Sequence, residues 1–148
     1  MACIEGVIVR KLNYIPDERG RLMEIMRSDD PFFQKFGQVY MTTAFPGVIK
    51  AWHYHSIQTD HFSVLVGMAK VTLYDNREDS PTFGSLDEFF TGEFNPLLIR
   101  IPPFVIHGFK ALGNREIVLL NCPTETYNHQ KPDEYRLPFN SEAIPYQW

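Results

Sequence analysis

The segment Gly47-Val-Ile-Lys-Ala-Trp-His-Tyr-His-Ser-Ile-Gln-Thr-Asp60 predicts a β-strand that ends in polar residues. His53 and His55 are two residues apart, so on a strand their side chains point to the same face. Asp60 begins the next apolar run, and alternation along that run places Asp60 on the core side and His61 on the opposite face. The two imidazoles and the carboxylate are therefore candidates for one site.

A third histidine lies in a similar apolar context, in the segment Ile101-Pro-Pro-Phe-Val-Ile-His107-Gly-Phe109. An imidazole among apolar side chains is costly to bury unless it has a polar partner. We therefore expect the strands that carry His53 and His107 to be antiparallel neighbours that line one interior pocket.

Short apolar runs separated by Gly, Pro and Asn predict an all-β fold, a sandwich or a barrel. We expect strand 60–66 to pair with strand 48–55, and hairpins at Gly67 and at Gly113-Asn114. One short helix is expected over 29–37, and the tail from 123 to 148 should wrap the outside. The expected strands are 4–12, 21–26, 38–44, 48–55, 60–66, 70–74, 86–94, 97–101, 105–112 and 116–121.

The chain of 148 residues is expected to be one domain, 1–148, and it has a net charge of −4, which leaves room for a small anionic ligand. Lys and Arg are scattered without a basic stripe, which argues against nucleic acid. No apolar run approaches the roughly 20 residues of a membrane span, and no signal peptide is visible at the start. Cys3 and Cys122 form no metal-binding spacing, and two free thiols favour a cytoplasmic protein.

Several motifs follow one another along the chain: Asp17-Glu-Arg-Gly20, the His53 segment, Ser80-Pro-Thr-Phe-Gly84 and the His107 segment. In this order and spacing they resemble the cupins and, within them, the dTDP-4-dehydrorhamnose 3,5-epimerases, over roughly residues 5–148. The resemblance implies a cupin double-stranded β-helix (jelly-roll) with few short helices. It also implies a homodimer with shared N-terminal strands, a nucleotide-sugar substrate of the dTDP-4-keto-6-deoxyhexose type, and no cofactor.

The resemblance assigns roles to individual residues. His53 falls on the base that removes a proton next to the keto group, which suits a side chain with a pKa near neutrality. Arg19 falls on an arginine that contacts the diphosphate, and Tyr127 lies within one residue of a tyrosine that stacks on the nucleotide base. Further substrate-pocket positions are occupied by Glu24, Gln38, Lys50 (an arginine in the family) and His107.

Three departures from the family pattern change what the resemblance implies. The family's catalytic tyrosine aligns with Leu120, which cannot donate a proton. Its pocket lysine aligns with Asp60 or His61, and the aspartate that orients its base has no counterpart before Trp148. We therefore expect a single-site epimerase, a ketoisomerase or another divergent isomerase, in which Tyr40, Tyr54 or Tyr127 could replace the acid.

Two other functions fit the same residues. Cupins in general carry a G-x5-H-x-H motif and a later histidine that bind a divalent metal. Here His53, His55, Asp60 and His107 match that set, and imidazoles with one carboxylate suit Zn, Ni, Fe or Mn. A non-catalytic sugar-binding module is the third reading; it would need Arg19 and Tyr127 but not His53.

Overall fold

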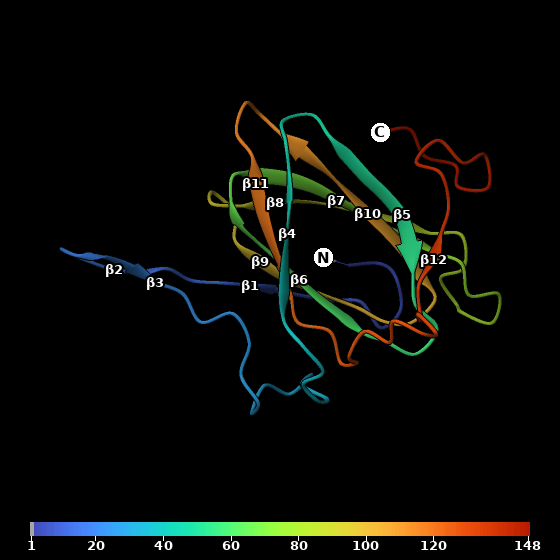
Figure 1. Cartoon of the computed structure of the whole chain (residues 1–148), viewed down its shortest axis with the longest axis horizontal. Coiled ribbons are helices and arrows are strands. Elements are labelled where there is room, and N and C mark those ends of the chain that lie inside the picture. The colour runs from blue at the N-terminus through green and yellow to red at the C-terminus, as the bar shows by residue number, and fades with distance from the viewer. Residues whose placement is uncertain (1) are drawn as a thin grey trace.

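The computed structural model describes residues 2–148 as two five-stranded antiparallel sheets that face each other, with a small hairpin projecting from one end (Figure 1). The first sheet has the order β1-β9-β6-β11-β4 and the second the order β12-β5-β10-β7-β8, while β2 and β3 form the hairpin. The strands are β1 (Ile8–Lys11), β2 (Ile15–Asp17), β3 (Gly20–Leu22), β4 (Tyr40–Ala44), β5 (Ile49–Tyr54), β6 (Asp60–Val66), β7 (Met68–Asp75), β8 (Leu86–Gly92), β9 (Leu97–Ile101), β10 (Val105–Leu112), β11 (Ile117–Asn121) and β12 (Tyr135–Arg136).

The core lies between the two sheets and is built from alternate residues of their strands. Val64 of β6 and Leu119 of β11 face it from the first sheet, and Val71 and Phe109 face it from the second. This arrangement follows from strand alternation, because alternate side chains of a strand point to the same face of its sheet. The all-β jelly-roll prediction is confirmed.

A second apolar cluster covers the outer face of the second sheet. Trp52 of β5 packs against Ile144, Tyr146 and Trp148 of the C-terminal tail, and its indole N–H donates to the carbonyl of Phe139. The C-terminal tail therefore packs against the outer face of β5, the strand that carries His53.

The predicted helix over 29–37 is wrong, and no helix occurs among residues 2–148. Tertiary contacts decide this segment: Asp30 pairs with Arg10, and the Gly37 N–H donates to the Pro123 carbonyl. A Cβ on Gly37 would lie 2.4 Å from the Glu125 backbone, so this glycine permits a close approach of two chain segments rather than ending a helix.

The predicted pairings of neighbouring strands are also wrong. Strand β5 pairs with β10 and β12, whereas β6 lies in the other sheet between β9 and β11. The turns at Gly67 and at Gly113-Asn114 likewise lead from one sheet to the other instead of closing hairpins. From β4 to β7 and from β8 to β12 successive strands alternate between the layers, so that each layer covers the apolar face of the other, whereas β7 and β8 pair within the second sheet. The predicted antiparallel pairing of the His53 and His107 strands is confirmed.

The part of the chain that the model describes contains no helix long and apolar enough to cross a membrane.

Candidate functional site

A cavity of about 1270 Å³ opens at one end of the sandwich. Strands β4 and β11 of the first sheet contribute one wall, and β5 of the second sheet contributes the other. The segment 125–136 forms part of the rim, so this section of the tail lines the cavity instead of wrapping the outside. Of the residues singled out from the sequence, those that line the cavity are Gln38, Tyr40, Lys50, His53, His55 and Tyr127.

A β-bulge in β5 decides which side chains reach the cavity. His53 lies opposite His107 and Lys50 lies opposite Phe109, so three residues of β5 span the same length as two of β10. Simple alternation would put Lys50 and His53 on opposite faces, but the additional residue brings both to the cavity side. Gly108 faces the bulge, where a Cβ would lie only 2.4 Å from the Cβ of Ala51.

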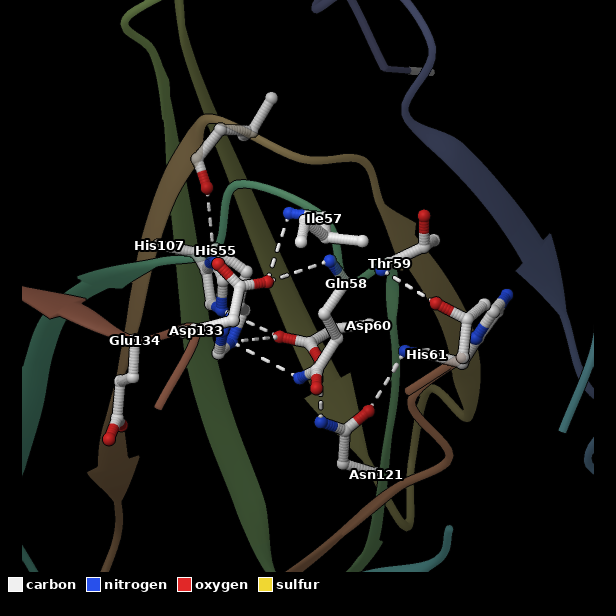
Figure 2. Close-up of polar contacts among 12 residues, drawn as sticks. His55, Ile57, Gln58, Thr59, Asp60, His61, His107, Asn121, Asp133 and Glu134 are labelled. Atoms are coloured by element: carbon white, nitrogen blue, oxygen red, sulfur yellow. Dashed lines mark hydrogen bonds and ion pairs between the residues drawn. The ribbon is translucent and has the colours of Figure 1, made fainter. Parts of the chain in front are cut away.

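Four polar side chains form a cluster: His53 and His55 from β5 and the residue after it, Asp60 from β6, and His107 from β10. His53 and His55 line the inner end of the cavity, whereas Asp60 and His107 are buried next to them and do not line it. One potential ligand atom from each lies within 4.8 Å of the others. Asp60 is fully buried, and its Oδ2 lies 3.1 Å from Nε2 of His55 and 3.1 Å from Nε2 of His107 (Figure 2). Asp60 belongs to this cluster and His61 faces away, as alternation predicted.

The other ring nitrogens of two of these histidines contact backbone carbonyls. Nδ1 of His107 lies 2.9 Å from the carbonyl of Val105, and Nδ1 of His55 contacts the carbonyl of Asp133. A carbonyl only accepts, so both Nδ1 atoms carry a proton and both Nε2 atoms point towards Asp60. Oδ1 of Asp60 in turn accepts from Gln58 at 2.7 Å and from Asn121 at 2.8 Å.

The charges in this cluster follow from its geometry. Burial would raise the pKa of Asp60, but its contacts with His107 and His55 outweigh burial and hold the pKa well below the usual range. Burial lowers the pKa of His55, yet the contact with Asp60 reverses this, so that the pKa is raised. Asp60 is therefore an ionised carboxylate that stabilises the charged form of His55.

His53 differs from the other two histidines. Among residues 2–148 its ring has no hydrogen-bond partner, and it packs edge-on against His107 with the ring centroids 4.1 Å apart. Burial, assisted by the neighbouring His107, lowers the pKa of His53 well below its ordinary value. The His53 ring is therefore neutral at physiological pH. It lines the cavity, and its unprotonated ring nitrogen has a free lone pair that can accept a proton.

Sequence reasoning missed Asp133, which holds the cavity rim. Its carboxylate accepts hydrogen bonds from the backbone N–H groups of Ser56, Ile57 and Gln58 and from the Ser56 hydroxyl (Figure 2). Its carbonyl accepts from His55. The local pattern around Asp133 gives no signal for this role, because its partners lie some 75 residues earlier in the chain.

Tyr40 faces His53 across the cavity from the other sheet. Its hydroxyl accepts a hydrogen bond of 2.9 Å from Asn121, which also donates to Asp60. Burial, with a smaller contribution from the charge of Asp60, raises the pKa of Tyr40 to about 12. Tyr40 is therefore protonated at neutral pH, and within residues 2–148 no acceptor takes its hydroxyl proton.

The leucine that faces the cavity is Leu119, not the Leu120 to which the family tyrosine was aligned. Leu119 and Asn121 lie on the inner face of β11, and Leu120 lies on the other face. A leucine occupies this part of the wall in either alignment, so the wall offers no proton donor at that position.

Besides His107 and Asp60, which are buried in the cluster, two predicted pocket residues do not line the cavity. Arg19 is exposed in the β2–β3 hairpin, where it pairs with Asp17, and Glu24 follows that hairpin and pairs with Arg27 at 3.0 Å. Neither lines the cavity of its own chain. Gln38 and Tyr127 do line it, and they are joined by a 3.2 Å hydrogen bond from the Tyr127 N–H to the Gln38 side chain.

Comparisons with known proteins agree with this fold. Residues 15–135 match the family model described as polysaccharide biosynthesis C-terminal domain. The chain is 43% identical over 145 residues to the spore coat polysaccharide biosynthesis protein SpsL of Bacillus subtilis, covering 98% of this chain and 96% of the relative. It is 45% identical over 150 residues to the probable low-salt glycan biosynthesis epimerase Agl13 of Haloferax volcanii, covering 100% of this chain and 96% of that one.

Solved structures give the same result. A dTDP sugar isomerase from Desulfovibrio desulfuricans G20 superposes with a TM-score of 0.93 at 38% identity, covering 98% of this chain and 92% of that chain. The rmlC epimerase of Mycobacterium tuberculosis superposes with a TM-score of 0.88 at 21% identity, covering 100% and 76%, which concerns the fold alone. The chain therefore belongs to the polysaccharide biosynthesis C-terminal domain family and has the cupin fold of the dTDP-4-dehydrorhamnose 3,5-epimerases.

Proposed function

We propose that this protein is a nucleotide-sugar epimerase or isomerase that acts on a dTDP-4-keto-6-deoxyhexose or a close analogue, with His53 as the base. The observation that carries the proposal is the division of roles among the three histidines. His55 and His107 contact Asp60, while His53 is neutral, has no hydrogen-bond partner among residues 2–148 and is open to the cavity. The relatives named as an epimerase and as a dTDP sugar isomerase support the same chemistry.

The reaction begins when a neutral His53 removes a proton from the carbon beside the keto group. Loss of this proton leaves an enolate, whose oxygen needs a positively charged or hydrogen-bonding partner. The imidazolium of His55, whose charged form Asp60 stabilises, and the side chain of Lys50 on the same wall are available in the cavity. Asp60 orients His55 and His107 rather than reacting itself.

Tyr40 is the acid in this proposal. It stands on the sheet opposite His53, so a flat enolate between them is reached by the base from one side and by the phenol from the other. Delivery of a proton to the carbon that lost one inverts its configuration, which is epimerisation. Delivery to the former carbonyl carbon, with transfer of the neighbouring hydroxyl proton to the enolate oxygen, leaves the carbonyl on the deprotonated carbon and is isomerisation.

Deuterium uptake tests this function. In D₂O, the wild type should exchange a proton of a dTDP-4-keto-6-deoxyhexose for deuterium, as followed by NMR, and His53→Asn should abolish the exchange. His129→Asn is the matched control, because His129 also lines the cavity but lies on its exposed rim. Wild-type protein that binds dTDP but exchanges nothing would instead support a sugar-binding module without turnover.

Tyr40→Phe separates the two chemical steps. It should leave exchange at the His53 side measurable while slowing product formation by about 100-fold, the usual size of an acid contribution. Equal product formation by Tyr40→Phe and wild type would assign the acid to another residue.

The homodimer belongs to the same proposal. The β2–β3 hairpin projects from the body of the molecule (Figure 1), and it exposes Ile15 and Leu22, which are 60% and 58% accessible. An arm of this kind can pair with a second copy and carry Arg19 and Glu24 towards that copy's cavity. Sedimentation should give the mass of two chains, and a fully active single chain would contradict the dimer.

A metal site is the second candidate, and a specific observation favours it. Oδ2 of Asp60 and Nε2 of His107 are buried and close, yet neither has a properly aligned hydrogen bond. The Nδ1–H groups of His55 and His107 each donate to a backbone carbonyl, which is the usual arrangement in metal-binding histidines. Separations near 3.1 Å also suit two ligands bonded at about 2.1 Å to one ion.

The residues that would hold the ion are His53, His55, Asp60 and His107, and the ion would supply a Lewis acid for a substrate carbonyl. Elemental analysis of protein purified without chelator should then find about one Zn, Ni, Fe or Mn per chain. Metal-free protein that takes up none of these four ions and still exchanges deuterium would exclude this candidate.

A further inference from the structure

Arg136 occupies a defined position beside the proposed base. Strand β12 pairs with β5 so that Arg136 lies directly opposite His53. The neighbouring residues Trp52 and Leu137 exchange two backbone hydrogen bonds, of 2.9 and 3.0 Å. In an antiparallel pair the next position is then a non-hydrogen-bonded one, in which facing side chains come closest and share one face. Arg136 and His53 both line the cavity.

The segment that carries Arg136 is fixed before any ligand arrives. Asp133 ties the rim to the turn after β5 through its four accepted hydrogen bonds, and its carbonyl contacts His55. On the outer face, Tyr135 stacks on Tyr54 with ring centroids 5.0 Å apart and planes 16° from parallel. Little conformational entropy is therefore lost when a ligand contacts this segment.

The guanidinium of Arg136 is available to a ligand. Its side chain is 76% exposed, and its ion-pair partner is Glu134, at 2.9 Å. An exposed pair of this kind contributes little and is readily exchanged for a stronger partner. Among residues 2–148, Arg136 is the one arginine that lines the cavity; Lys50 and Lys131 are the lysines.

The charges divide the cavity into two ends. The inner end holds the buried histidine and Asp60 cluster, which is suited to a keto sugar, whereas Arg136 and Lys131 stand at the exposed rim. Arg19, the residue expected to contact the diphosphate, lies in the projecting hairpin outside this cavity. An arginine fork matches the geometry of phosphate oxygens and can bind them in a bidentate manner.

We propose that Arg136 binds the diphosphate of the nucleotide sugar and so places the sugar beside His53. This inference rests on the proposed function, from which it takes the nucleotide-sugar ligand, and it adds a binding residue from β12. The guanidinium exchanges Glu134 for two phosphate oxygens when the ligand enters.

Titration calorimetry with dTDP tests the inference on the full chain. Arg136→Ala should raise the Kd for dTDP by about 10- to 100-fold, the loss expected for hydrogen bonds to a charged group. The Kd of Arg136→Lys should lie between those of the wild type and Arg136→Ala, because lysine keeps the positive charge but cannot bind two phosphate oxygens in the bidentate manner of a guanidinium. Thymidine, which has no diphosphate, should bind both variants as it binds the wild type.

Arg115→Ala is the matched control. Arg115 is also an exposed arginine, paired with Glu93 at 3.0 Å, but it lies outside the cavity. It should leave the Kd for dTDP unchanged. Arg136 is exposed, so its substitution should leave the thermal unfolding midpoint near that of the wild type, which ensures that folded proteins are compared.

The outcomes distinguish this inference from the proposed function. An unchanged Kd for dTDP in Arg136→Ala, with deuterium exchange intact in the wild type, overturns the inference alone. A slower exchange at saturating substrate with unchanged Kd would place Arg136 at the reacting oxygen and also overturn it. Wild type that binds dTDP through Arg136 but exchanges nothing would leave the contact standing and remove the proposed reaction.

Discussion

The substitution Gly108→Ala tests whether the β5 bulge positions the proposed base. Gly108 lies between His107 and Phe109, opposite the bulged residues of β5. A Cβ there would lie 2.4 Å from the Ala51 Cβ, 2.8 Å from the Ala51 Cα and 3.0 Å from the Lys50 carbonyl oxygen. Two of these distances are shorter than carbon atoms tolerate, so the strands must separate locally.

The expected loss of unfolding free energy is about 3 kcal/mol, the upper part of the range for overpacking, because backbone rather than a flexible side chain must move. In a domain of this size that loss lowers the unfolding midpoint by about 6 to 12 °C. Activity should fall further than stability. A displacement of about 1 Å at a base can cost about 100-fold in rate, and His53 sits at the bulge.

Urea denaturation and deuterium exchange, measured on the same preparations, check both effects. Ala51→Gly in the Gly108→Ala background removes the 2.4 Å contact and should recover about half of the lost stability. Gly113→Ala is the control: it has a φ of +74° and no atom within 4 Å, so it should cost about 1 kcal/mol from backbone strain without changing exchange. If Gly108→Ala is as stable and active as wild type, or Ala51→Gly gives no recovery, the reasoning about the bulge is refuted.

Two further predictions concern the polar network, both measured by urea denaturation of chelator-treated protein. Asp60→Asn should cost about 3 kcal/mol at pH 5.5 and less at pH 8.5. Although burial opposes it, the Asp60 contact raises the pKa of His55 above its unfolded value of about 6.5. The contribution of the Asp60–His55 contact to stability is therefore complete below about pH 6.5 and is lost as the pH rises through the raised pKa of His55. If Asp60→Asn lowers the free energy of unfolding equally at both pH values, this expectation is contradicted. Asp133→Ala should cost about 2 to 3 kcal/mol by leaving three backbone N–H groups of the 56–58 turn without their acceptor, whereas Asp133→Asn, which keeps an acceptor oxygen, should cost less. Equal stability of the alanine variant and wild type would show that water replaces the carboxylate.

Features that depend on local strand geometry could be predicted from the amino-acid sequence. Side chains alternate along a strand for steric reasons, so His53 and His55 had to share a face, and Asp60 rather than His61 had to turn inward. The apolar context of His107 similarly placed it in the interior near the other two. The family motifs added the jelly-roll fold, which the comparisons confirm.

The distribution of the strands between the two sheets, and the residues that complete the site, depend on long-range contacts in the folded chain. Turn residues mark where a strand ends, but they do not say whether the chain returns to the same sheet or crosses to the other, because that depends on which arrangement buries both apolar faces. The bulge that turns Lys50 inward arises from pairing with β10. Asp133 and Arg136 reach the cavity through contacts with residues far away in the chain, and such contacts leave no local pattern in the sequence. The sequence offered Tyr40, Tyr54 and Tyr127 as candidate acids, and the contact of Tyr40 with Asn121 becomes visible only in the fold.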